Sequence, residues 1–420
     1  MSEGLDVGGR VRPQITIEEF RVGCEAFLAA RYEPKVVTRT AFVWGRGSDA
    51  VDLFDEVDPA EERATVAAVR RWRRELWDNG LGWISGPPEL GGRGLPARYQ
   101  RAFDELAGRY EVPGNGKLTA SLGIVAPALA AHGSPSLQHL LLPAMHAGDV
   151  IACQLFSEPG AGSDLASVST RAVRDGAGWR ITGQKVWTTG AHYSDVGMAL
   201  CRTADGPRHR NLTAFVVDMR DPGVEVRPLR QMTGGSEFNE VFLTDVRVAD
   251  ADRLGDVGDG WAVALTTLRH ERQNIGDRGF GGRGLLGIER YRRMAEVFGV
   301  SRDPIVRQAF ADLVVHLRVG KYTGSRAADL ARAGGGTGGE GPIAKLQLAA
   351  NYQRISDYVG RVIGPGLVAD TGAWGTFAWR GFVVGAPSMR IGGGTDEILK
   401  NQLAERVLGL PKDAVARPAP

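Results

Sequence analysis

The amino-acid sequence predicts a multidomain α+β protein with an all-α N-terminal domain, a middle antiparallel β-barrel or sandwich, and a C-terminal helical bundle. The prediction rests on two changes in the spacing of apolar residues along the chain. This spacing is helical from about residue 15 to 146, strand-like from 151 to about 254, and helical again after residue 260. The changes divide the chain into a tail (1–12), an α-helical domain (13–150), a β domain (151–255), a helical-bundle domain (256–412) and a second tail (413–420).

Composition is that of a globular protein and excludes several classes of function. The chain has 420 residues, 43% hydrophobic and 24% charged, which is enough for two or three domains. A net charge of +2 without a dense Lys/Arg block argues against binding to nucleic acid or an acidic membrane. Three dispersed cysteines form no disulfide or zinc pattern, and residues 1–12 do not resemble a secretory signal. The apolar stretches are too short to span a bilayer, so we expect a soluble, cytoplasmic protein.

The N-terminal domain begins with a helix-start signal. Thr16 and Glu19 have the spacing of a capping box ahead of an apolar helical face, and residues 63–76 repeat the helical pattern. Glycine and proline at 86–88 and 91–94 interrupt the helices.

Three evenly spaced histidines follow, namely His132, His139 and His146. We expect Pro135 and Pro143 to break any continuous helix through them. No carboxylate or cysteine completes a ligand set, so we expect no metal site.

The middle domain is predicted as short strands separated by turns, which favours a small barrel or sandwich. The expected strands are residues 168–173, 179–186, 196–201, 213–217, 224–229 and 241–248. A turn at 175–178 separates the first two strands.

Long helical patterns return in the last domain and should pack as a bundle. The expected helices are residues 261–275, 285–298, 305–331, 343–362 and 397–408. Glycine-rich residues 334–341 are interpreted as a solvated linker. Residues 279–284 match Gly-x-Gly-x-x-Gly, but they follow a helix rather than a strand, so we do not expect a Rossmann site there.

Two segments of the middle domain indicate a flavin site. Residues 154–164 read Gln-Leu-Phe-Ser-Glu-Pro-Gly-Ala-Gly-Ser-Asp. The hydroxyls of Ser157 and Ser163 and the small residues 160–162 lie where a strand passes into a loop, and exposed backbone N–H groups there can meet an anion or a polarised ring.

The second segment, residues 186–190, reads Val-Trp-Thr-Thr-Gly. The indole of Trp187 can cover a flat heterocycle, and the hydroxyl of Thr189 can bond its polar edge. Each segment alone is typical of an ordinary loop or core strand, but their order and separation are specific. Together they resemble the signature of the acyl-CoA dehydrogenase family, and the resemblance extends from about residue 11 to 410.

The resemblance implies the three-domain architecture of that family, with a four-helix bundle as the last domain, and FAD as cofactor. Carried over position by position, the implied FAD contacts are Phe156, Ser157, Gly162, Ser163, Trp187, Thr188, Thr189, Arg361, Thr395 and Glu397. The implied substrate contacts are Ser163, Arg272 and Gly394.

The implied chemistry needs a glutamate base for the α-proton of a thioester, and donors for the charge on its oxygen. The family places this base either in the loop before the last helix or on the first C-terminal helix. Gly393 stands at the loop position and supplies a backbone N–H to the thioester oxygen instead. Glu271 stands at the helix position, as in isovaleryl- and long-chain-type members, and is the candidate base. Asp396 is an alternative base, although helix capping also explains it.

The implied activity is oxidation of an acyl-CoA to the trans-2-enoyl thioester in lipid catabolism, with electrons passed to an electron-transfer flavoprotein. A homodimer or homotetramer is implied, yet residues 297–302 and 361–365 depart from the family's adenine-binding pattern. A subunit of a heteromeric dehydrogenase for steroid or other bulky acyl groups is therefore an alternative. Two further alternatives are an oxidase or acyl-carrier-protein dehydrogenase of secondary metabolism, and a binding subunit without catalytic activity. The sequence leaves acyl length, branching and carrier open, and weakly favours a branched, long or bulky chain.

Overall fold

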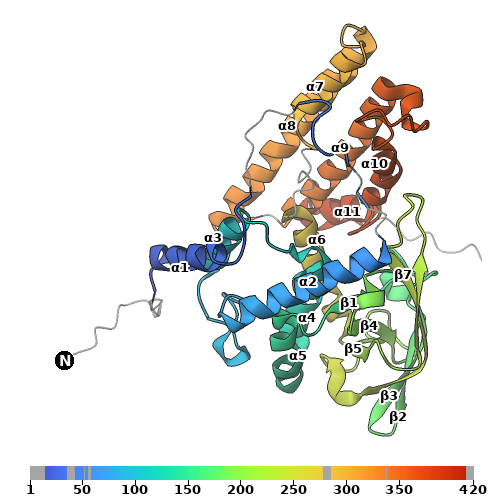
Figure 1. Cartoon of the computed structure of the whole chain (residues 1–420). Coiled ribbons are helices and arrows are strands. Elements are labelled where there is room, and N and C mark those ends of the chain that lie inside the picture. The colour runs from blue at the N-terminus through green and yellow to red at the C-terminus, as the bar shows by residue number, and fades with distance from the viewer. Residues whose placement is uncertain are drawn as a thin grey trace, which may run out of the picture.

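The computed structural model describes residues 15–35, 43–51, 53–54, 58–277, 285–336 and 338–412. Figure 1 shows helices of the N-terminal half, a green sheet and a group of orange and red helices that follow one another along the chain. This order confirms the predicted fold class. The two tails and the Gly-x-Gly-x-x-Gly segment at 279–284 lie outside the described residues.

The N-terminal domain is helical, as predicted. Its α-helices are α1 (Ile17–Ala29), α2 (Pro59–Asp78), α3 (Ala97–Ala107), α4 (Ala126–His132) and α5 (Pro135–Ala147). The capping box is present: the Thr16 hydroxyl accepts the Glu19 N–H, and the Glu19 carboxylate accepts the Thr16 N–H. Helix α2 starts four residues earlier than expected because Asp58 caps it.

The predicted break at Pro143 is wrong. Helix α5 begins at Pro135, which occupies its first position, and continues through Pro143 to Ala147. Proline at a first helical position costs nothing, and one internal proline removes a single backbone hydrogen bond. Buried Leu142 and Met145 anchor the helix on either side of Pro143, so His139 and His146 share one helix.

The described strands form an eight-stranded, mainly antiparallel sheet. They are β1 (Ala152–Leu155), β2 (Arg171–Asp175), β3 (Gly178–Thr189), β4 (Val196–Arg202), β5 (Leu212–Asp218), β6 (Val224–Leu229), β7 (Phe238–Ala249) and β8 (Arg253–Leu254). The short strand β1 pairs with β4 in parallel. This pairing places the start of the 154–164 motif at the sheet, next to the helices.

The C-terminal helices agree with the predicted ones to within a few residues. They are α6 (Gly260–Asp277), α7 (Ile288–Val297), α8 (Pro304–Arg332), α9 (Glu340–Ile363), α10 (Trp379–Gly385) and α11 (Asp396–Gln402). A π-helical turn, Leu403–Val407, continues α11 toward the predicted end. Helix α10 was not predicted. No helix among the described residues is both long and apolar enough to cross a membrane.

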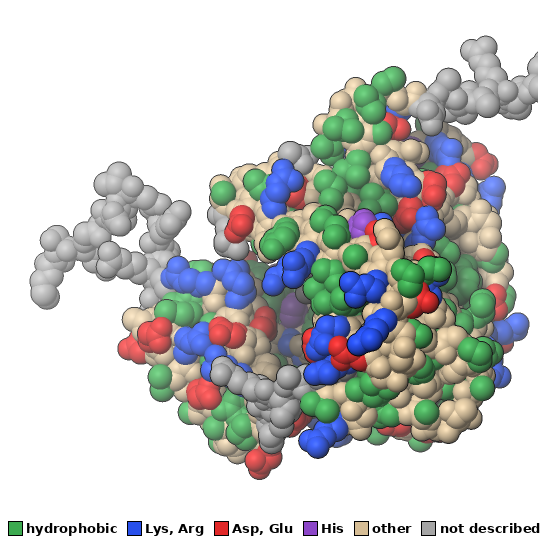
Figure 2. Space-filling model, turned by 90° about the horizontal axis from the view of Figure 1, so that it is seen from above, with side chains coloured by type: hydrophobic (Ala, Val, Ile, Leu, Met, Phe, Trp, Pro, Cys, Tyr) green, Lys and Arg blue, Asp and Glu red, His purple; other side chains and the backbone are tan. Residues whose placement is uncertain are grey.

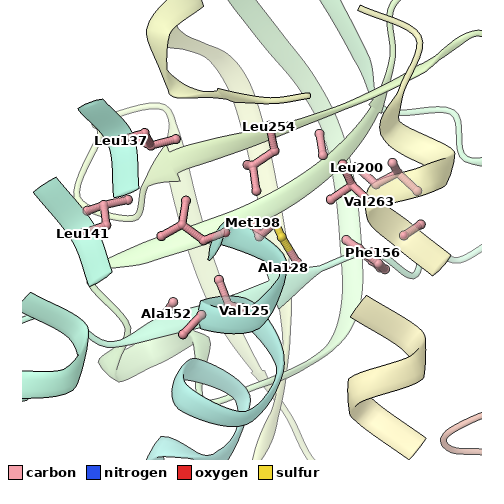
Figure 3. Packing of buried hydrophobic residues seen from close by; sticks show 14 of the residues in the cluster. Val125, Ala128, Leu137, Leu141, Ala152, Phe156, Met198, Leu200, Leu254 and Val263 are labelled. Atoms are coloured by element: carbon pink, nitrogen blue, oxygen red, sulfur yellow. The ribbon is translucent and has the colours of Figure 1, made fainter. Parts of the chain in front are cut away.

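A shared core joins the domains. Figure 3 shows Leu137 and Leu141 of α5, Met198 and Leu200 of β4, and Val263 of α6 in this cluster. Because α6 also packs against α9, it contacts the N-terminal helices, the sheet and the bundle.

Charged side chains do not gather by sign on the face of the molecule shown in Figure 2. Basic and acidic side chains are interspersed there with hydrophobic ones.

Candidate active site

A buried ion pair fixes the loop that follows β1. The Lys185 side chain on β3 has no exposed surface, and its Nζ lies 2.8 Å from a Glu158 carboxylate oxygen. The ammonium also donates to the backbone carbonyls of Phe156 and Leu200. Glu158 in turn accepts hydrogen bonds from the backbone N–H groups of Ser169 and Thr170. These contacts hold the 157–164 loop against β3.

The electrostatics of this pair favour the charged form. Burial alone would raise the pKa of Glu158, but the Lys185 ammonium and the hydrogen bonds from Ser169 and Thr170 lower it to about 2. This contribution to stability is complete above the carboxyl's ordinary pKa of 4.5 and is lost as the pH falls toward 2. The loop is therefore firmly held at neutral pH.

The backbone of β3 is irregular where it passes this loop. The pairing of β3 with β7 shifts between Lys185 and Thr188, and Trp187 has a left-handed φ of 62°. Its indole remains 56% exposed, with its edge against Phe238 at a centroid distance of 5.8 Å. Because left-handed backbone is costly for a residue with a side chain, the surrounding contacts must hold Trp187 in place.

The residues after Trp187 alternate in direction. Thr189, like Trp187, is exposed, whereas Thr188 is buried, and the Thr188 hydroxyl has no hydrogen-bond partner among the described residues. The carbonyl of Thr188 accepts a 3.0 Å hydrogen bond from the Asn239 amide, which also lies 3.1 Å from His192 Nδ1. The side chain of Thr188 thus points into the protein, away from the surface formed by Trp187 and Thr189.

The remaining residues of the first motif differ in exposure. Gly162 and Ser163 are exposed in the loop, and Ser157 is partly exposed while its carbonyl accepts the Val186 N–H at 2.9 Å. Phe156 is buried, and its ring packs in the shared core of Figure 3. Because the Phe156 ring and the Thr188 hydroxyl are buried, only the backbone atoms of these two residues remain for the predicted FAD contacts.

The exposed residues fit a flat, polar heterocycle. Trp187 offers an aromatic surface, Thr189 offers a hydroxyl beside it, and the adjoining loop offers small residues whose backbone a ligand can approach closely. This donor set agrees with the flavin that the motif predicts.

Glu271 lies where three elements meet. Its Oε2 lies 3.4 Å from Nε2 of Gln154, a residue of β1, three positions before Ser157. The backbone N–H of Gly393, in the loop before α11, also interacts with this carboxylate. Burial raises the pKa of Glu271, against the opposing influence of Gln154, Arg272 and Gly393. A carboxylate whose pKa is raised is better matched to accepting a proton near neutral pH.

The predicted substrate residue Arg272 is next to Glu271 and is partly buried. Burial lowers its pKa, while the neighbouring Glu271 carboxylate raises it.

The loop before α11 is shaped by glycine. Gly393 and Gly394 have φ angles of 70° and 99°, which side chains disfavour. The ammonium of Lys345, a buried residue of α9, donates to the Gly394 carbonyl at 2.7 Å. Lys345 thereby fixes the loop whose Gly393 N–H meets Glu271.

The acidic residues after this loop have structural roles. Asp396 is buried. One of its carboxylate oxygens lies 2.7 Å from Nε of Arg390, and the other lies 3.7 Å from Nζ of Lys345. Thr395 is the N-cap of α11 and accepts the Ile398 N–H, and Glu397 is exposed in the first turn. The carboxylate of Asp396 is therefore engaged by two cations.

Arg361 is not brought to this site within one chain. It is exposed near the end of α9, sixteen residues beyond Lys345. At 1.5 Å per residue the two positions are about 24 Å apart along the helix axis.

A surface cavity beside α2 lies elsewhere. It has a volume of about 640 Å³ and is lined by α2 residues such as Arg70 and Arg74 and by Asp149. Arg70 pairs with Asp195 and Arg74 with Asp149, so these charges already have partners. We therefore assign no function to this cavity.

Comparison with known proteins gives the family. The middle-domain profile of acyl-CoA dehydrogenases matches residues 153–246, and their C-terminal-domain profile matches residues 258–408. The acyl-CoA dehydrogenase IpdE1 of Mycolicibacterium smegmatis is 33% identical over 95% of this chain and 99% of its own length. This chain belongs to the acyl-CoA dehydrogenase family. The family consists of flavin-dependent oxidoreductases of lipid catabolism, as the sequence motifs predicted.

Other relatives agree with this assignment to the acyl-CoA dehydrogenases. IpdE1 of Mycobacterium tuberculosis is 37% identical over 85% of this chain and 91% of its own length. FadE34 of Mycobacterium tuberculosis is 38% identical over 83% of this chain, but the match spans 48% of FadE34, about half its length.

Two solved structures share the fold. The Tcur3481-Tcur3483 steroid ACAD has a TM-score of 0.70 at 24% identity, covering 94% of this chain and 98% of that one. The ChsE4-ChsE5 complex from Mycobacterium tuberculosis has a TM-score of 0.67 at 24% identity, covering 96% of this chain and 100% of that one.

Sequence reasoning missed four supporting side chains: Gln154, Lys185, Lys345 and Asn239. Gln154 does leave a signal, because it is a polar residue in an otherwise apolar strand segment at the start of the first flavin motif. Lys185 follows the polar Gln184 in a mixed strand, so its burial leaves no such signal. Lys345 and Asn239 leave none, since the atoms they bind belong to distant parts of the chain.

Proposed function

We propose that this chain is an FAD-dependent acyl-CoA dehydrogenase in which Glu271 removes the α-proton of a bulky acyl thioester. The observation that carries the proposal is the meeting of Glu271 with Gln154 and Gly393. Gln154 leads directly into the flavin motif, and Gly393 belongs to the loop proposed to bind the thioester oxygen. Base, cofactor loop and substrate loop thus converge on one carboxylate.

The proposed cofactor contacts follow the exposed surface. Trp187 and Thr189 would hold the flavin ring, with Gly162, Ser163 and the backbone of Phe156, Ser157 and Thr188. Thr395 and Glu397 are proposed for the nucleotide half. FAD, when bound, accepts the β-hydrogen as hydride. Ser163, Arg272 and Gly394 are proposed to contact the substrate.

The roles of the protein groups follow from their charge. The Glu271 carboxylate accepts the α-proton and becomes neutral, which its partly buried position favours. The backbone N–H of Gly393 donates to the thioester oxygen as negative charge develops there. The Lys345 ammonium holds the Gly394 carbonyl, so that the loop does not have to rearrange during the reaction.

A bulky acyl group is favoured by the relatives and by the position of the base. One solved structure of this fold is a steroid ACAD, and a relative 31% identical over 61% of this chain is the cyclohexane-1-carbonyl-CoA dehydrogenase of Syntrophus aciditrophicus. In this chain, a base on α6 and a glycine at position 393 leave the substrate loop without a side chain at that point.

A heteromeric enzyme is the second candidate. The position of Arg361, remote from the Gly393 loop, supports an FAD-binding half completed by another subunit. One of the solved structures of this fold is a complex of two proteins, ChsE4 and ChsE5. A homodimer or homotetramer that completes the site with a second copy of this chain is the alternative. Electron transfer to an electron-transfer flavoprotein is likewise a proposal.

The deciding test is substitution of Glu271 by glutamine. Glu271→Gln should retain the flavin absorbance near ~450 nm and lose at least about 10³-fold in the rate at which a panel of acyl-CoAs bleaches it anaerobically, because the general base is gone. Glu289→Gln, at an exposed position of α7, is the matched control and should retain bleaching. Undiminished bleaching by Glu271→Gln would remove Glu271 as the base. If the wild-type chain stays colourless with added FAD, a partner subunit is needed to bind the cofactor. If oxygen rather than the electron-transfer flavoprotein reoxidises the reduced flavin, the enzyme is an oxidase.

A further inference from the structure

Gln154 occupies a position where an apolar side chain would be expected. Its neighbours on β1, Cys153 and Leu155, pack into the core on one face of the sheet. Ala152 and Phe156, which alternate with them, pack into the core shared with α5 and α6. Gln154 lies between Ala152 and Phe156 on that second face. A partly buried amide is costly there unless it is hydrogen-bonded, and the Glu271 carboxylate at 3.4 Å is its partner.

The second donor to Glu271 is needed elsewhere during the proposed reaction. In the substrate-free chain, the Gly393 N–H interacts with the Glu271 carboxylate. The proposed function directs this same N–H to the thioester oxygen. One backbone N–H does not serve two anionic oxygens at full strength, so substrate binding weakens its bond to Glu271. The amide of Gln154, fixed to the sheet through the pairing of β1 with β4, does not have to move.

We propose that Gln154 is a positioning residue for the base, and that its amide holds the Glu271 carboxylate in place when the thioester oxygen also accepts from the Gly393 N–H. This inference rests on the proposed function. Gln154 donates to the charged carboxylate, so it stabilises the state that accepts the proton. It also ties the position of the base to the strand that carries the flavin loop.

The test replaces the amide with an unbranched apolar side chain of similar length. Gln154→Met and wild-type holoenzyme are compared by the rate of anaerobic flavin bleaching with one acyl-CoA between about pH 5.5 and 9. Removal of a donor to the carboxylate should move the acid limb of this profile upward by about one pH unit, with a rate about tenfold lower on that limb. The flavin content and the substrate concentration at half-maximal rate should change less than about twofold, because Gln154 contacts neither molecule in the proposal.

Two further variants control the experiment. Gln184→Met removes a matched glutamine of β3 that donates to Glu240 at 2.9 Å, and its pH profile should stay that of the wild type. Gln154→Asn keeps an amide that is one methylene shorter, and should give a smaller shift than Gln154→Met.

The outcomes separate the two ideas. An acid limb that stays in place in Gln154→Met, while Glu271→Gln is inactive, overturns the role of Gln154 and leaves the base assignment standing. The same holds if Gln154→Met loses flavin but the remaining holoenzyme has the wild-type profile, because that result describes packing. If Glu271→Gln remains active, the proposed function and this inference both fail.

Discussion

Trp187 combines an exposed aromatic ring with a backbone conformation that favours glycine. Such strain persists where the neighbouring structure holds it, and it is found at ligand sites. Here the buried Lys185, two residues earlier, and the Asn239 amide, which binds the next residue's carbonyl, hold the strand on both sides. The irregular backbone therefore serves to present the indole.

Substitution of Trp187 separates its ring from its backbone. Trp187→Ala and Trp187→Gly both remove the indole and should both lose FAD affinity, which titration of the flavin measures. Glycine also relieves the left-handed strain. The free energy of unfolding, measured in urea, should therefore be about 1 kcal/mol higher for Trp187→Gly than for Trp187→Ala. Equal stability of the two variants would show that the backbone at 187 is relaxed.

The sequence predicts individual site residues only where a motif carries them. It predicts Glu271 and Gly393 through the family resemblance, and the structure brings them into contact although 122 positions separate them. Gln154 lies 117 positions from Glu271, and no spacing within one sequence encodes such a contact. The left-handed backbone at Trp187 also escapes prediction, because nothing in the residue type indicates it.

At the scale of elements, Lys345 connects α9 to the loop before α11. Its replacement by methionine should raise the half-saturating acyl-CoA concentration several-fold, because the Gly394 carbonyl loses its donor. It should also lower the free energy of unfolding by about 2 kcal/mol, since Asp396 loses one of its two cations. Steady-state kinetics and urea unfolding measure the two effects. Lys400→Met changes an exposed lysine of α11 and should match the wild type in both.

The helices show what periodicity does and does not predict. The expected helix at 261–275 agrees with α6 because its apolar period is long and uninterrupted. Helix α5 continues through Pro143 because packing of its buried face outweighs one lost hydrogen bond. Helix α10 was missed because seven residues are too short to establish a period. Tertiary packing, which one sequence does not display, decides the last two cases.

At the scale of the whole molecule, stability should depend on pH through His146. Its ring stacks on Trp83 at a centroid distance of 3.9 Å. Burial and the nearby Arg73 lower its pKa from 6.5 to about 3. Below pH 6.5 the unfolded chain binds a proton that the folded chain excludes, so the free energy of unfolding falls as the pH drops toward 3.

Urea unfolding between pH 7 and 5 measures this effect. Within that range Glu158 keeps its full contribution to the free energy of unfolding. The fall in this free energy between pH 7 and 5 should therefore be smaller in His146→Gln than in the wild type. His139→Gln, at an exposed position of the same helix, should leave the decline unchanged. An identical slope in wild type and His146→Gln would assign the acid sensitivity to other groups.

The contact between Glu271 and Gly393 also restricts how such a site evolves. If mutation placed a glutamate at position 393 while Glu271 remained, two carboxylates would compete for one pocket, and one of them would take up a proton. The new side chain would also have to adopt left-handed backbone, at a cost of about 1 kcal/mol. In the proposed function, loss of Glu271 first would leave an inactive enzyme. On that proposal, relocation of the base to position 393 has to cross a less fit intermediate.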